Sequence, residues 1–195
     1  VYPPKEHFEW YEKIRNIKVG QVPIGLMTEA TAWESMATFL IDGGDFIEVF
    51  VNRCRQKGLS PIVSFRLNDP QFNEPPEKCA LRFAMYAVNR FWYEHPEYRI
   101  GQNVEKGSER VFDWKHKEVR DHKFSFIKEI CENYDIDGLQ LDFMRNPVYF
   151  NLEETTQSQR QEIMTNFIKR VRNVLDESAS KGSHRYLSLR IPCFS

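Results

Sequence analysis

The sequence has no excess of charge of either sign. Its 195 residues include 27 Lys and Arg against 28 Asp and Glu, which gives a formal net charge of -1 at pH 7. Proteins that bind nucleic acid through its phosphates carry an excess of basic residues. The composition therefore argues against a nucleic-acid partner.

Long apolar runs are also missing. No stretch of the chain approaches the roughly 20 consecutive apolar residues that cross a bilayer, so we expect no membrane partner. The segment after Val1 lacks the pattern of a signal peptide. With 41% hydrophobic residues the chain can nevertheless bury a core, and its length predicts a single domain over residues 1–195.

Metal-ligand spacing is absent as well. His116 and His122 are spaced unlike metal ligands, which indicates solvated surface positions. The four cysteines are scattered, and two of them fall on apolar faces of predicted helices, where a buried free thiol is typical, although disulfide pairing stays open. These cysteines are Cys54, Cys79, Cys131 and Cys193. We expect neither a metal nor another cofactor.

What the sequence does contain is an alternation of helix and strand patterns. Apolar spacing predicts helices near residues 5–17, 45–58, 77–93, 119–134 and 153–179. Strand patterns cover residues 62–69, 136–143 and 186–191, with a weaker one within residues 20–30. Such alternation predicts a parallel sheet with right-handed crossovers.

Polar residues within the strands favour a barrel over an open, doubly wound sheet. Helices cover both faces of a doubly wound sheet, whereas the interior of a barrel accepts polar groups toward its C-terminal mouth. Seven polar residues share the inward parity of the three strands: Ser64, Arg66, Asn68, Gln140, Asp142, Ser188 and Arg190. We therefore predict a partial (β/α)8 TIM-type barrel of parallel strands. A full barrel takes about 250 residues, so we expect the chain to be a fragment.

Asp142 stands near the end of the most apolar strand. Burying an unpaired carboxylate costs several kcal/mol, so this residue belongs either to an ion pair or to a site. It could simply neutralise Arg66 and Arg190, which share its parity, or it could be a nucleophile or base that these arginines keep ionised. If all three are buried together, removing the carboxylate charge would cost about 3 to 5 kcal/mol.

Two segments carry a resemblance to a known group of proteins. The stretch EVRDHKFSFIKEICENYDIDGLQLDFMRNPVYF resembles the helix-and-strand signature of glycoside-hydrolase-like TIM barrels, in which DG-x-x-LDF-x-R-x-P closes the fourth strand. GLSPIVSFRLND resembles the third-strand segment of the same proteins. The resemblance covers roughly the middle of the chain. α-L-fucosidases are a more distant likeness. The chitinase pattern DG-x-D-x-D-x-E does not fit, because Gln140 and Met144 replace its middle aspartate and its glutamate.

The resemblance implies a glycosidase, a hydrolase of glycosyl bonds, acting on a carbohydrate at the C-terminal mouth of the barrel. In the fucosidases an aspartate at the end of the fourth strand is the nucleophile, and that role would fall on Asp142. Glycosidic hydrolysis canonically needs a second carboxyl group, for which Asp69, Glu29 or a residue beyond Ser195 are the candidates. A non-catalytic carbohydrate-binding barrel is the alternative. The predicted substrate contacts are Arg66, Asn68, Gln140, Arg145, Tyr149 and Arg190.

Several interpretations stay open at this point. Arg145 could bind substrate or cap its own loop, and Asp137 is more typical of a turn or strand entry than of a catalyst. Four aromatic residues could stack on sugars, although the first two lie in a predicted helix and suit a core: Trp92, Tyr93, Trp114 and Tyr149. The long excursion over residues 70–113 predicts a wall of the cleft. The unmatched positive charge of the two inward arginines predicts an acidic partner, either another carboxylate or an anionic substrate such as a uronic acid.

Overall fold

The computed structural model describes residues 35–36, 38–40, 42–71, 73, 89–103, 105–180 and 183–193. The chain divides into two compact units, Val1–Ile47 with Gln71–Pro96 and Glu48–Pro70 with Glu97–Ser195. The predicted helix at 5–17, the weaker strand within 20–30, most of the predicted helix at 77–93, and the residues Glu29 and Cys79 lie outside the described residues.

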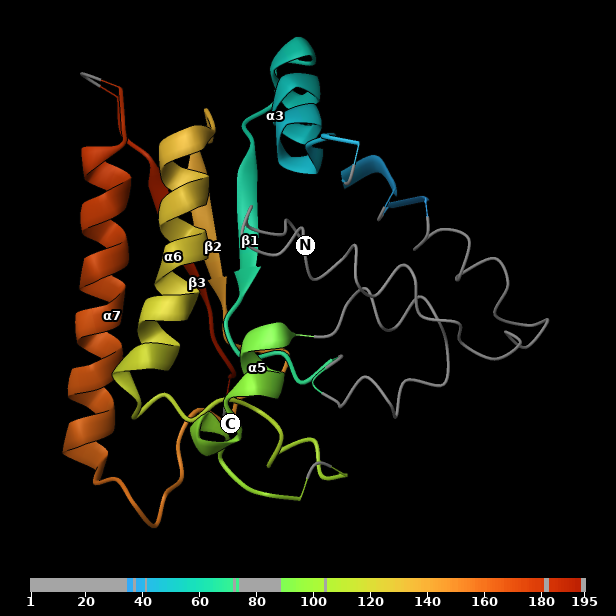
Figure 1. Ribbon diagram of the computed structural model, residues 1–195. Helices are drawn as coiled ribbons and strands as arrows, with labels where there is room; N and C mark the ends of the chain where they lie inside the picture. Colours follow the sequence, from blue (N-terminus) through green and yellow to red (C-terminus); the bar gives the residue numbers. More distant parts are fainter. Residues whose placement is uncertain are drawn as a thin grey trace. The chain divides into compact units, whose positions relative to one another are not determined.

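The second unit is built on a three-stranded parallel sheet (Figure 1). Its strands are β1 (Ile62–Arg66), β2 (Gly138–Asp142) and β3 (Tyr186–Arg190), and they lie in the order β1-β2-β3. Helix α6 (Lys117–Asn133) lies between β1 and β2 in the sequence, and α7 (Gln157–Glu177) lies between β2 and β3. The predicted α/β class with parallel strands is therefore confirmed. Among the described residues the sheet is not closed, so the barrel stays a prediction.

Both helices pack on one face of this sheet. Figure 1 shows α6 and α7 side by side, and α7 contacts β3. On the covered face, Leu139 and Leu141 of β2 are fully buried, and the ring of Phe65 in β1 lies 6.4 Å from that of Phe126 in α6. The helices contribute Val119, Phe124, Ile127, Ile130, Phe167, Val171, Val174 and Leu175 to the same core. The apolar residues of one strand parity thus fix which face of the sheet the helices cover.

Helix α7 begins later than predicted. A capping box defines its start: Thr156 Oγ1 accepts a hydrogen bond from the amide of Gln159 (3.3 Å), and Gln159 Oε1 accepts one from the amide of Thr156 (2.9 Å). The residues just before it form a turn in which Asn151 Oδ1 accepts from the amide of Glu153 (3.1 Å). This turn competes with helix at the predicted starting point.

Helix α3 (Phe46–Gln56) lies within the predicted range, residues 45–58. Asp45 Oδ1 accepts a hydrogen bond from the amide of Ile47 (2.9 Å), and Gly58, with φ of +66°, follows the helix end. Most of α3 belongs to the second unit, whereas α5 (Arg90–Glu94) lies in the first, and the 3-10 turn η4 (Pro96–Tyr98) follows it. Trp92 in α5 is fully buried, as the core interpretation predicts, whereas Tyr93 is exposed.

The amino-terminal edge of the sheet is held by ion pairs. Arg55 bonds both carboxylate oxygens of Asp137 (2.9 and 2.6 Å) and also Asp135 (3.1 Å). These hydrogen bonds from Arg55 are the main reason why the pKa of Asp137 is lowered. Asp137 directly precedes β2, so its interpretation as a strand-entry residue is confirmed.

The histidines and cysteines complete the picture of the core. His116 and His122 are both partly buried in aromatic contacts, so they are less exposed than the surface prediction implies. Cys131 is buried and free, and burial raises the pKa of its thiol to about 11. Within the described part of the chain, no helix is both long and apolar enough to cross a membrane.

Candidate functional site

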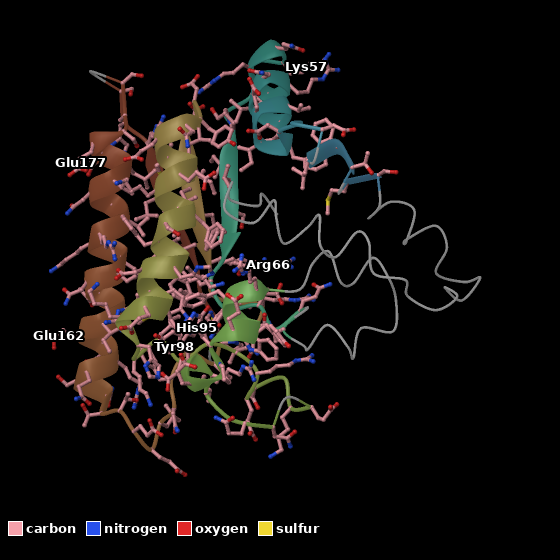
Figure 2. All side chains as sticks on the ribbon, in the orientation of Figure 1. Lys57, Arg66, His95, Tyr98, Glu162 and Glu177 are labelled. Atoms are coloured by element: carbon pink, nitrogen blue, oxygen red, sulfur yellow. The ribbon has the colours of Figure 1, made fainter. Side chains whose placement is uncertain are left out.

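The carboxyl end of the sheet brings three charged side chains into one row. The strand register places Arg66 of β1 and Arg190 of β3 on either side of Asp142 in β2. This row lies on the face opposite Leu139 and Leu141, which we call the open face. Figure 2 shows Arg66 at the carboxyl end of β1. The parity predicted from the alternating residues is thus correct for these three positions.

A second polar row lies one step back on the open face. Ser64, Gln140 and Ser188 are register partners, and Ser64 Oγ donates a hydrogen bond to Gln140 Oε1 (3.0 Å). Gln140 therefore lies next to Asp142 on the same face, where a ligand on the open face could reach its amide nitrogen. This agrees with the position that the sequence predicts for it.

Asp142 itself is fixed at both carboxylate oxygens. Its Oδ1 accepts a hydrogen bond from the amide of Met144 (2.8 Å), and its Oδ2 lies 3.4 Å from Nη1 of Arg190. The Asp142 side chain is only 6% exposed, whereas that of Arg190 is 59% exposed. The pair therefore joins a buried carboxylate to a guanidinium that reaches the surface of the sheet.

Asp69 is a second carboxylate beside this row of charged side chains. Arg66 Nη1 lies 3.0 Å from Asp69 Oδ2, and Arg145 Nε lies 3.6 Å from Asp69 Oδ1. Arg66 thus pairs with Asp69, which corrects the expectation that both flanking arginines pair with Asp142. Because Arg66 is the register neighbour of Asp142, the two carboxylates belong to one group of charges. We call Arg66, Asp69, Asp142, Arg145 and Arg190 the strand-end cluster.

Asn68 does not continue the open face. It lies beyond the end of β1 and is buried, with its Nδ2 donating to the carbonyls of Phe112 (2.9 Å) and Val148 (2.7 Å). Its Oδ1 accepts from the amide of Phe112 (3.1 Å). The side-chain amide therefore joins the segment before α6 to the loop after β2. This places Asn68 as a structural link, so we leave it out of the proposed ligand contacts.

Two of the aromatic candidates, Trp114 and Tyr149, differ in burial. Trp114 is fully buried and packs edge-on against Tyr149 and Phe167, so it offers no face to a sugar and the prediction of stacking is wrong for it. Tyr149 is partly buried. Burial raises the pKa of its phenol far above the usual range, and the negative charge of Asp142 adds to the shift. Tyr149 is therefore a neutral hydrogen-bond donor close to Asp142.

Lys123 is a site neighbour that sequence reasoning missed. Its Nζ lies 5.1 Å from the ring centroid of Phe112, and burial lowers its pKa to about 8, while the charge of Asp69 acts in the opposite direction. A lysine in a charged helical stretch is typical of a solvated surface, and no spacing signal distinguishes this one from Lys117 or Lys128. Only the packing of α6 over the end of β1 brings it near Asp69.

Two hollows lined by described residues of the second unit lie away from the strand-end cluster. The larger one, about 660 Å³, lies between α6 and α7 and includes Lys117, Asp121, Glu162 and Arg170 in its lining. Another of about 520 Å³ lies beside the loop after β2, where Tyr149 lines it. Neither of these two hollows is lined by Asp142 or Asp69. Among the described residues, no three His, Cys, Asp or Glu side chains are grouped to hold a metal ion.

Comparison with known proteins gives a distant likeness to carbohydrate-active enzymes. No protein-family model matches the chain. It is 26% identical over 121 residues to the 1,4-alpha-glucan branching enzymes GlgB of three Prochlorococcus marinus strains, AS9601, MIT 9301 and MIT 9215. The match covers 62% of this chain but 15% of each of those enzymes. The likeness therefore points toward glucan-branching enzymes and not specifically toward α-L-fucosidases.

Proposed function

We propose that the chain carries the active site of a glycosidase, at the carboxyl end of its parallel sheet. The observation that supports this most is Asp142, a buried carboxylate on the last residue of the central strand and on the face opposite the helices. In (β/α) barrels the carboxyl ends of the strands are where catalytic residues lie. The distant similarity to branching enzymes supports a carbohydrate as the substrate.

Asp142 takes the part of nucleophile or base. An ionised carboxylate is required for either role, and the neighbouring guanidinium of Arg190 stabilises that form. The amide of Met144 fixes the orientation of the carboxylate through Oδ1. Tyr149, whose phenol stays neutral, supplies a hydrogen-bond donor nearby. Oδ2, which has the longer contact, is the oxygen available to a substrate.

Asp69 takes the part of the second carboxyl group. Hydrolysis of a glycosidic bond canonically uses two carboxyl groups that face each other across the scissile bond. Asp69 belongs to the same group of charges as Asp142 through Arg66, which is the ion-pair partner of one and the register neighbour of the other. Within this proposal Asp69 is the second carboxylate, which the binding-only alternative does not need.

A turnover assay with the full chain tests the proposal. The assay uses a panel of aryl glycosides and oligosaccharides, with Asp142→Asn and Asp69→Asn as site variants. Asp137→Asn is the matched control, because this carboxylate lies at the opposite end of β2 and binds Arg55. We expect both site variants to lose turnover by about a thousandfold or more, while the control retains it. Binding of a glycan without any turnover by the wild type would instead favour the non-catalytic alternative.

A further inference from the structure

The strand-end cluster contains more positive than negative groups. Three guanidinium groups, those of Arg66, Arg145 and Arg190, accompany the carboxylates of Asp69 and Asp142. Lys123 adds another positive charge close enough to Asp69 to interact with it. Among the described residues of this cluster, four cationic side chains thus lie beside two carboxylates, although the whole chain has a net charge of -1.

The arginines also keep hydrogen-bonding capacity for a ligand. Arg190 reaches Asp142 through Nη1 alone, at 3.4 Å, which is at the long end of the hydrogen-bonding range. Its side chain is 59% exposed, and within the described part of the chain its guanidinium has no other partner. Arg66 likewise bonds Asp69 through Nη1, and its side chain is 51% exposed. A guanidinium carries five N–H donors, so most of the donors on these two residues remain available.

We infer that the substrate of this site is an acidic carbohydrate, one whose sugar rings carry carboxylates, as in a uronic acid. The inference rests on the proposed function, since it names the substrate class of the same site. A planar guanidinium matches a carboxylate in a two-point contact, and the excess positive charge attracts an anion to the open face. A neutral glucan, the polymer named for the related branching enzymes, gains nothing from that charge.

The geometry assigns the contact to the arginines beside the catalytic candidate. Arg190 is the register neighbour of Asp142, so a ring whose carboxylate binds Arg190 lies next to the proposed nucleophile. Arg145 follows β2 directly, and its side chain is 49% exposed. The Arg145 ion pair with Asp69 places this second cation by the second carboxylate. Of the two roles considered for Arg145, ligand contact and loop capping, this proposal takes the ligand contact.

Binding to matched acidic and neutral oligosaccharides tests the inference. The full chain is titrated with oligogalacturonate, oligomannuronate and oligoglucuronate, each compared with its methyl-esterified form, which keeps the rings and removes the charge. We expect at least one acidic form to bind about tenfold or more tightly than its ester, and raising the salt concentration should reduce that difference. Binding of every ester as tightly as its acid, or no binding of any acidic form, overturns the inference.

Variants separate a specific contact from general attraction. Arg190→Gln and Arg145→Gln should each remove most of the preference for the acidic form. Arg170→Gln should leave it unchanged, because Arg170 lies on α7 and pairs with Asp121 outside the cluster. If the cluster variants lose affinity for the acidic and the esterified oligosaccharides equally, the arginines do not contact the carboxylate.

Turnover in parallel distinguishes this inference from the proposed function. Turnover of neutral glycosides alone, abolished in Asp142→Asn, would support the function and overturn the acidic substrate. Binding of a uronate with no turnover of any substrate would support the acidic ligand and contradict the glycosidase.

Discussion

Asp142 has a buried carboxylate, but its ion-pair partner Arg190 is exposed. The exposure of Arg190 determines how much stability is lost when Asp142 is replaced. Asn at this position keeps an Oδ1 that accepts from the Met144 amide and loses only the charge facing Arg190. Because the Arg190 side chain is 59% exposed, water can solvate the guanidinium that is left behind. The buried triad that the sequence suggests, with its cost of about 3 to 5 kcal/mol, is therefore not what the structure contains.

We expect Asp142→Asn to lower the free energy of unfolding by about 1 kcal/mol or less. Chemical denaturation of the wild type and the variant measures this difference. Asp137→Asn is the comparison, because Asp137 makes two short hydrogen bonds to Arg55 and should lose at least as much stability. A loss of several kcal/mol in Asp142→Asn alone would show that the Asp142–Arg190 pair is buried after all.

Lys123 should produce a pH dependence of stability. Its pKa in the folded chain is about 8 against an ordinary value of 10.5, so between these values the unfolded state binds more protons than the folded state. The free energy of unfolding therefore rises as the pH increases from about 8 to 10.5. Below about pH 8 the buried amine is charged in the folded chain and destabilises it fully. We expect Lys123→Met to abolish the rise and to increase stability near pH 7 by about 1 to 2 kcal/mol, since the side chain is only partly buried.

Denaturation at several pH values between 7 and 10.5 checks this expectation. This range covers the lowered and the ordinary pKa of Lys123. Lys128→Met provides the control, because Lys128 lies on the same helix, is exposed, and pairs with Glu132. If the wild type and Lys123→Met show the same dependence on pH, the amine is not buried in the way the structure indicates.

At the scale of elements, Asn68 links the two segments that border the carboxyl end of the sheet. Its amide makes hydrogen bonds to the main chain of Phe112 and Val148. Replacement by Leu leaves buried polar groups without partners, each costing about 1 to 3 kcal/mol. We expect Asn68→Leu to destabilise the chain by about 3 kcal/mol and to speed amide exchange in both segments.

Asn133→Leu is the matched control for this prediction. Asn133 is exposed at the end of α6, so its replacement should change stability by less than about 0.5 kcal/mol. Denaturation and hydrogen exchange of the two variants make the comparison. An Asn68→Leu chain as stable as the wild type would indicate that these loops do not depend on the link.

The elements themselves follow from local patterns, and for that reason the sequence predicts them well. Alternation over residues 62–66, 138–142 and 186–190 places Arg66, Asp142 and Arg190 on one face, as the register confirms. The prediction fails where the pattern is extended past the end of an element. Asn68 has the parity of Arg66, but β1 ends at Arg66, so the alternation no longer determines its direction.

Features that depend on contacts between distant segments could not be predicted. The pairing of Arg66 with Asp69 instead of Asp142 depends on the turn after β1, and the burial of Trp114 depends on Phe167, far along the chain. Lys123 becomes unusual only because α6 packs near Asp69. Periodicity reports which side of an element is apolar, and it contains no information about which segment covers that side.

At the scale of the whole molecule, the main question is whether the sheet closes into a barrel. Among the described residues β2 is paired on both sides, whereas β1 and β3 are each paired on one side. The open face carries polar side chains, which suits a barrel interior, and α6 and α7 cover the other face. Closure would require additional strands beside β1 and β3, and their presence can be detected at single amides.

The amides of β3 report on this most directly. The amide of Tyr186 bonds the carbonyl of Asp137, and the carbonyl of Arg190 accepts from Phe143, so alternate residues of β3 face β2. The amides of Leu187 and Leu189 consequently point to the other edge of the strand. If the sheet ends at β3, these two amides should exchange with solvent at least about a hundredfold faster than the amides of Ser188 and Arg190.

Hydrogen exchange followed by NMR measures these four amides in one sample, and the amides of Leu139 and Leu141 in β2 serve as the internal standard because that strand is paired on both sides. Exchange at Leu187 and Leu189 that is as slow as in β2 would mean that another strand pairs with β3. A further outcome is that the amides of Leu187 and Leu189 exchange fast in this chain and slowly in a version extended beyond residue 195. That result would identify β3 as the strand to which the rest of a barrel attaches. Fast exchange in both would contradict the barrel and leave an open sheet, with the strand-end cluster at its carboxyl edge.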